Sequence, residues 1–246
     1  MRQLSGVEVS RELAEGRRHT EQWIFKGGTG TYLRAVTLKE CVTHARREQH
    51  PLRMQLEIID PTDDALCTAY AQFRSSLTPG PDGTGETWTS ERTRKESFAT
   101  ILAACWYRQH FTLLTVEVGL SKIMTTFRWD LSSHSVIMTH DDQSGPALIF
   151  TKGQPYYRAY SRELETSFRQ TRRVHIEKAS GLQLSEEPTI EETRKLFIML
   201  DLELPRSFTN RDVSDVITKA LKAKNPYLAN RAKIPSADWS AFGIPK

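Results

Sequence analysis

The chain has 246 residues, of which 38% are hydrophobic and 26% charged, and these values are ordinary for a soluble globular protein. The composition excludes collagenous, disulfide-scaffold and wholly disordered proteins, and no apolar stretch approaches the roughly 20 residues of a membrane helix. The net charge of +4 is mild, so it allows nucleic-acid binding without implying it. The N-terminus has no apolar segment of the secretory type, and we therefore expect a cytoplasmic protein.

The first half of the chain alternates between strand and helix patterns. A short strand at Gln22–Phe25 enters a glycine-rich turn, and a helix follows from about Leu38 to Arg47. Leu52–Ile59 has apolar residues at every second position, which predicts a strand. The strand ends at Asp60-Pro61, and because proline suits the first helical position, Asp60 is expected to cap the next helix.

Strands dominate the next region. A loop rich in Pro, Gly and Thr at 76–90 precedes a long helix at about Glu91–Gln109. A helix at about Pro155–Arg172 closes the region. Between the two helices, turn residues separate the expected strands, which are Thr112–Val118, Lys122–Asp130, His134–Thr139 and Ala147–Thr151.

The last part of the chain reads as a helical extension. Residues 175–188 resemble a linker, and Thr189 with Glu192, then Thr209 with Asp212, give two capping-box patterns. Two short helices cannot bury both apolar faces alone, so they must dock on the main body or on a partner. The order of elements predicts an α/β protein with a mixed sheet flanked by helices over 1–178, and a small helical C-terminal extension over 185–246.

The cysteines Cys41, Cys67 and Cys105 are odd in number and widely spaced, so they form neither a disulfide framework nor a zinc site. Each lies beside apolar neighbours in a segment that reads as helix. We interpret them as small buried hydrophobic residues in a reducing compartment.

The glycine-rich turn is the first candidate site. After a strand, the backbone N–H groups of such a turn can hold a phosphate, and Lys26 would add positive charge. The spacing fits neither the P-loop nor the dinucleotide-binding fingerprint. A tight turn that requires a positive φ is the alternative explanation. The candidate residues are Lys26, Gly27, Gly28, Thr29 and Gly30.

Histidines and acidic residues give a weaker candidate. His134 and His140 flank one expected strand, and His140 is followed by Asp141 and Asp142. Histidine and aspartate suit a metal, but six residues of strand separate the two histidines by about 20 Å. A polar turn after a strand explains the cluster as well. We expect no metal and no cofactor, and keep His134, His140 and Asp141 as weak catalytic candidates.

A basic cluster follows the tyrosine-bearing helix. Arg169, Arg172 and Arg173 lie near its end, where positive charge complements the helix dipole. The same residues could instead contact an anion or a nucleic acid.

Several short sequence words are similar to those of a known family. They are Trp23–Gly30, Leu56–Pro61, Phe127–Asp130, His134–Thr139, Gly145–Leu148 and the helix Tyr156–Arg173. Over roughly residues 20–175, the chain resembles the phospholipase D-like superfamily in its bacterial form. The resemblance implies a phospholipase D-like fold and a homodimer, and it adds Arg128 to the phosphate-binding candidates.

The chemistry of that family depends on a His-x-Lys motif, in which the histidine attacks a phosphodiester and the lysine binds its phosphate. None of the seven histidines here is followed by lysine two positions later. The resemblance therefore implies a pseudoenzyme that binds a nucleotide, a nucleic acid or a protein partner, in a setting such as bacterial antiviral defence or regulation. The alternatives are a phosphodiesterase or nuclease with a non-standard His/Asp site, and a structural assembly subunit.

Overall fold

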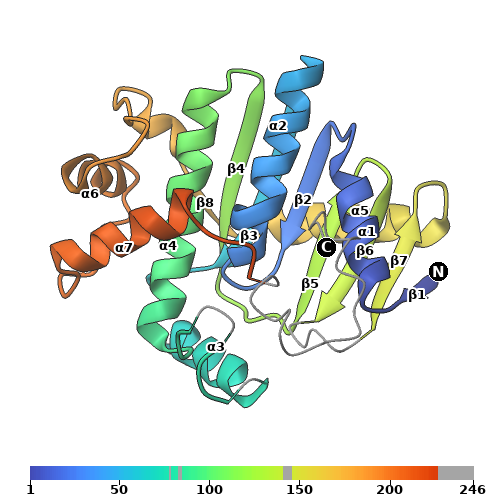
Figure 1. Ribbon diagram of the computed structural model, residues 1–246, viewed down its shortest axis with the longest axis horizontal. Helices are drawn as coiled ribbons and strands as arrows, with labels where there is room; N and C mark the ends of the chain where they lie inside the picture. Colours follow the sequence, from blue (N-terminus) through green and yellow to red (C-terminus); the bar gives the residue numbers. More distant parts are fainter. Residues whose placement is uncertain (78, 83–84, 141–145, 227–246) are drawn as a thin grey trace, which may run out of the picture.

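The computed structural model describes residues 1–77, 79–82, 85–140 and 146–226 (Figure 1). The strands are β1 (Arg2–Leu4), β2 (Gln22–Lys26), β3 (Leu52–Ile59), β4 (Leu114–Ser121), β5 (Phe127–Ser132), β6 (Ser135–His140), β7 (Ala147–Thr151) and β8 (Arg172–Val174). The α-helices are α1 (Val7–Arg17), α2 (Lys39–Glu48), α3 (Asp64–Leu77), α4 (Ser90–His110), α5 (Pro155–Arg169), α6 (Ile190–Met199) and α7 (Asn210–Leu221). A π-helical segment η1 (Leu33–Leu38) leads into α2, and a short 3₁₀ helix η2 (Ile176–Ala179) follows β8.

All eight strands form one sheet, in the order β1-β7-β6-β5-β2-β3-β4-β8. The central strands β2, β3 and β4 are parallel, and every other neighbouring pair is antiparallel. The expected α/β architecture, a mixed sheet flanked by helices, is therefore confirmed. β2 has a parallel neighbour on one side and an antiparallel neighbour on the other, so it marks the boundary between the two halves of the sheet.

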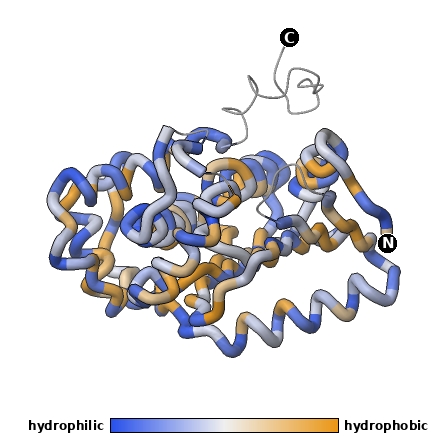
Figure 2. The backbone as a smooth tube through the Cα atoms, turned by 90° about the horizontal axis from the view of Figure 1, so that it is seen from below, coloured by the Kyte–Doolittle hydropathy of each residue, from blue (hydrophilic) through white to orange (hydrophobic). Residues whose placement is uncertain are grey.

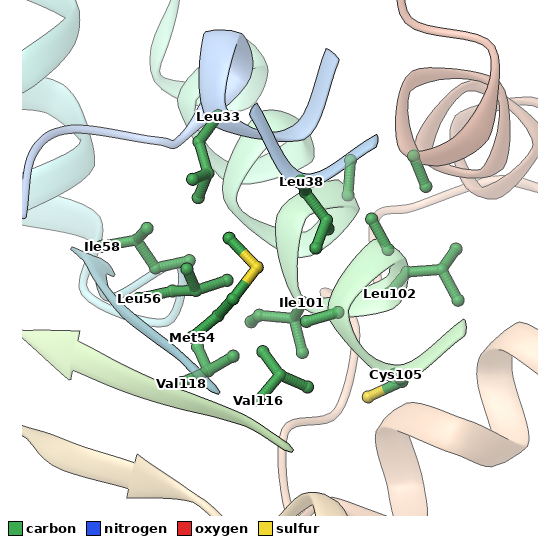
Figure 3. Packing of buried hydrophobic residues seen from close by; sticks show 14 of the residues in the cluster. Leu33, Leu38, Met54, Leu56, Ile58, Ile101, Leu102, Cys105, Val116 and Val118 are labelled. Atoms are coloured by element: carbon green, nitrogen blue, oxygen red, sulfur yellow. The ribbon is translucent and has the colours of Figure 1, made fainter. Parts of the chain in front are cut away.

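Helices cover both faces of the sheet unequally. Leu52, Met54, Leu56 and Ile58 of β3 alternate toward one face and belong to the larger core cluster. Figure 3 shows Met54, Leu56 and Ile58 beside residues of η1, α4 and β4. The opposite face carries a smaller cluster under α5, which passes behind the sheet in Figure 1. Figure 2 shows the hydrophobic residues gathered in the middle of the molecule, between the helical layers.

Helix α4 is buried on more than one side, because the sheet covers one side and the C-terminal helices cover another (Figure 1). The Phe98 ring meets Phe197 of α6 edge-on at 5.0 Å and Phe208 at 6.2 Å between ring centroids. Both expected capping boxes are present, at Thr189 and at Thr209. The C-terminal helices thus dock on the body of their own chain.

Asp60 does not cap the helix after β3, which corrects the expectation from Asp60-Pro61. Helix α3 begins at Asp64, and Asp63 Oδ1 accepts the hydrogen bond from the Leu66 N–H. Asp60 Oδ1 instead accepts from the N–H and hydroxyl of Thr62. The proline starts a turn rather than a helix, so the capping position moves three residues along the chain.

Other differences concern short elements. Residues 1–20, whose sequence lacks clear periodicity, form β1 and α1. The strand expected at Lys122–Asp130 begins only at Phe127, and the expected helix to Arg172 ends at Arg169. β8 follows and pairs with β4 through three residues, too few to show a period in sequence.

The three cysteines are buried and unpaired, as expected. Burial raises the pKa of the Cys67 and Cys105 thiols to about 12 and also raises that of Cys41. In the described part of the chain, no helix is both long and apolar enough to cross a membrane.

Replacing Phe98 by alanine tests the docking of the C-terminal helices. We expect Phe98→Ala to lower the free energy of unfolding by about 3–5 kcal/mol, because the ring is fully buried and the cavity would open between α4 and α6. Urea unfolding followed by circular dichroism measures the change. Ile123→Ala, at a side chain that is 77% exposed, is the control and should change it little. An equally small loss for Phe98→Ala would contradict the docked arrangement.

Candidate functional site

The glycine-rich turn lies at the carboxyl end of β2, where the parallel and antiparallel halves of the sheet meet. Two backbone hydrogen bonds tie it to β3: the Gly27 N–H donates to Glu57 O at 3.1 Å, and the Ile59 N–H donates to Gly28 O at 3.1 Å. In open α/β sheets, ligands bind at the carboxyl ends of the strands, at the point where the strand order changes direction. The turn lies at the carboxyl end of a parallel strand, next to the antiparallel strand β5.

Gly30 has a positive φ of 77°, a conformation that favours glycine. An added Cβ would also lie 3.0 Å from Cγ2 of Thr100. The Thr100 hydroxyl donates to the Thr29 carbonyl at 2.7 Å, so α4 supports the turn from below. The positive φ predicted as one explanation of the glycines is therefore present, at Gly30.

Gly28 serves a different purpose. A Cβ at this position would lie 2.1 Å from the hydroxyl oxygen of Tyr70, a residue of α3. The glycine thus allows a protein side chain to approach the turn closely. Tyr70 also meets the Trp88 ring edge-on at 5.9 Å, which connects the turn to the packing between α3 and α4.

The turn leads directly into a helix. Helical structure begins at Thr31, and the π-helical segment η1 follows from Leu33. Such segments are rare and occur often at functional sites. The hydroxyls of Thr29 and Thr31 are 3.0 Å apart, and Thr31 donates to Glu96 Oε2 at 3.0 Å. These contacts hold the start of the helix in place.

Arg128 on β5 lies beside the start of this helix. Its guanidinium stacks 4.5 Å from the ring centroid of Tyr32 and donates to Asp130 Oδ2. Asp130 Oδ1 also accepts from the Trp23 indole N–H at 3.1 Å. The contacts place the buried Arg128–Asp130 ion pair next to the start of the helix that follows the turn.

Lys26 points away from this group. The side chain lies on the α5 face of the sheet, where Nζ donates to the Ser167 hydroxyl at 2.6 Å and lies 3.6 Å from Glu57 Oε1. The Ser167 hydroxyl in turn donates to Glu57 Oε1 at 3.0 Å. The structure therefore separates Lys26 from the other phosphate-binding candidates, because Lys26 neutralises a buried carboxylate instead.

The two histidines lie at opposite ends of β6. His140 pairs with Phe127 at the same edge of the sheet as the glycine-rich turn, whereas His134 precedes β6 at the other edge. Asp141 lies outside the described residues. Within those residues, no group of three or more His, Cys, Asp or Glu side chains could hold a metal ion.

The basic cluster is largely paired with carboxylates. Arg172 makes a bidentate contact with Asp60, with Nη2 at 2.8 Å from both oxygens, and Arg173 binds Glu117. Arg169 lies 3.6 Å from Glu165 on α5. Arg172 and Arg173 belong to β8, so they hold the edge strand and the end of β3 rather than complement a helix end.

One buried ion pair has no obvious signal in the sequence. Arg34 and Glu96 are both almost fully buried and in direct contact, and Arg34 also donates to the Thr100 hydroxyl at 2.7 Å and to the Lys219 carbonyl at 2.6 Å. Burial alone would raise the pKa of the Glu96 carboxyl, but the charges of Arg34, Lys219 and Arg92 outweigh it and lower that pKa to about 2. Glu96 is therefore an anion in the folded protein.

No family model matches the chain, and no curated protein matches it.

The Glu96 carboxylate should make the free energy of unfolding depend on pH in the acidic range. Because its pKa falls from 4.5 to about 2 on folding, its stabilisation is complete above pH 4.5 and is lost as the pH falls toward 2. The shift corresponds to about 3 kcal/mol. We expect Glu96→Gln to reduce stability at pH 7 and to flatten the fall in the free energy of unfolding between these pH values. Urea unfolding across the pH range measures this. Glu163→Gln, on exposed α5 surface, is the control, and an unchanged slope in Glu96→Gln would contradict the assignment.

Gly30→Ala tests the conformation of the turn. We expect a loss of about 1–3 kcal/mol of stability, because the side chain would be strained at positive φ and pressed against Thr100. Thermal unfolding compares this variant with Gly181→Ala, where an added Cβ meets open space. Equal melting temperatures for the two variants would show that the turn does not require glycine.

Proposed function

We propose that this protein is a non-catalytic module that binds a phosphate-bearing ligand, a nucleotide or a nucleic acid, at the glycine-rich turn. The observation that carries the proposal is the position of the turn. It stands at the carboxyl edge of β2, at the start of a helix, with the Arg128 guanidinium beside it. Helix starts and backbone N–H groups favour anions, and arginine matches phosphate geometry.

The backbone of the turn adds support. Thr29 and Gly30 are buried, yet among the described residues no acceptor receives a hydrogen bond from the N–H of either. Buried N–H groups nearly always have a partner, so a water or an anion is expected there. An anion bound to these groups would also lie next to the start of the helix.

The phospholipase D-like resemblance is part of the proposal. A mixed sheet flanked by helices is what that resemblance implies, and the carboxyl edge of the parallel strands carries the candidate residues. The absence of a His-x-Lys motif favours binding over cleavage. The resemblance also implies a homodimer and a role in bacterial defence or regulation. The separation of His134 from His140 gives the phosphodiesterase alternative no specific support.

The test is ligand binding by wild type and by Arg128→Gln. We expect saturable binding of ATP or pyrophosphate in calorimetry, or of labelled single- or double-stranded DNA or RNA in fluorescence anisotropy. Binding should weaken between about 50 and 200 mM salt, because phosphate contacts release counterions. Arg128→Gln should raise Kd at least about tenfold, the loss of one charge-assisted hydrogen bond.

Two further variants make the result interpretable. Arg158→Gln removes an exposed arginine of α5 and should leave Kd unchanged. Arg128→Lys keeps the positive charge but loses the planar guanidinium. Circular dichroism shows whether each variant is folded. The absence of binding to every probe, or equal affinity in a folded Arg128→Gln variant, would overturn the proposal.

A further inference from the structure

A cavity of about 620 Å³ lies between the C-terminal part of α4, the first turn of α6 and α7. These helices lie next to one another on the side of the molecule away from β1 (Figure 1). The volume is typical of a small-molecule site. The cavity is remote in sequence from the glycine-rich turn, and its lining includes no residue of that turn.

One part of the cavity wall is apolar and aromatic. Trp106 is held in place, because its indole N–H donates to Ser185 O at 3.0 Å and its ring stacks on His110 at 4.0 Å. Tyr107 meets the indole edge-on at 5.0 Å. The apolar side chains that line the cavity are only partly buried against the core: Trp106, Tyr107, Ile190, Ile217 and Leu221.

The same cavity carries carboxylates. Glu186, Glu187 and Glu191 line it, together with one cation, Lys222. Lys222 Nζ is 2.8 Å from Glu187, and no ion pair within the described part of the chain includes Glu186 or Glu191. Glu191 gains from the helix dipole in the first turn of α6, but Glu186 precedes that helix and has no such support. These exposed carboxylates therefore give the rim of the cavity a net negative charge.

We propose that this cavity binds an alkylammonium group, with its methylene chain against the apolar walls and its ammonium at Glu186 and Glu191. The negative rim of the cavity attracts a cation and repels an anion. Indole and phenol rings add attraction for a cation. A free polyamine and a lysine side chain of a partner protein present this same chemistry.

The test titrates the full-length protein with spermidine and, separately, with the peptide acetyl-Gly-Lys-Gly-amide, at about 50 mM salt where charge attraction is weakly screened. Calorimetry gives Kd, and the change in tryptophan fluorescence should disappear in Trp106→Phe. We expect saturable binding, and we expect Glu186→Gln/Glu191→Gln to raise Kd at least about tenfold. The control Glu163→Gln/Glu203→Gln removes two exposed carboxylates elsewhere and should leave Kd unchanged.

The outcomes separate the sources and the proposals. Binding of spermidine without binding of the peptide identifies a free amine as the ligand, and saturable binding of the singly charged peptide identifies a lysine of a partner. Binding of neither, or binding that both double variants retain equally, would overturn the proposal. Arg128→Gln should leave amine binding unchanged, so this site and the phosphate-binding site stand or fall separately.

Discussion

The ion pair between Arg34 and Glu96 is the interaction on which the structure around the glycine-rich turn depends. A charge removed from water is costly unless a partner and further hydrogen bonds compensate it. Here Arg34 also binds Thr100 of α4 and the Lys219 carbonyl of α7, while Glu96 accepts from Thr31 at the start of the helix. One buried pair thus connects the glycine-rich turn, the central helix and the C-terminal extension.

This connection bears on how the turn would meet a ligand. Thr29 and Thr31 are already held by each other, by Thr100 and by Glu96. Gly30 has a positive φ, and Thr100 packs against it. A turn held in this way loses little conformational freedom on binding, so more of the interaction energy appears as affinity. The packing of α4 against the turn therefore fixes the backbone conformation of the turn.

Local patterns in the sequence predicted the strands and helix starts that depend on neighbouring residues alone. The alternation in Leu52–Ile59 predicts β3, and the Thr189 and Thr209 capping boxes predict the starts of α6 and α7. The alternation of β2 also predicts which face of the sheet Lys26 occupies, although the expected phosphate-binding set did not take it into account. Phe25 faces the larger core, so the next residue must face α5, away from the helix that follows the turn.

Contacts between distant residues could not be read in the same way. Arg34 and Glu96 are 62 positions apart in the sequence, and no period or motif would pair them. The placement of Arg128 and His140 at the edge of the glycine-rich turn depends on the antiparallel register of β5 with β2 and β6. The sequence predicted the strands but left their order in the sheet open. The site is therefore a product of tertiary pairing.

Helix α4 has one more consequence. Thr100 supports the glycine-rich turn, and Trp106, near the end of the same helix, lines the cavity. Six residues of α-helix span about 9 Å, so the two places share one short rigid rod. If both proposed ligands bind and one of them displaces α4, the other site is displaced as well. Thermodynamic linkage then requires that the two ligands change each other's affinity by the same factor, in the same sense, whichever binds first.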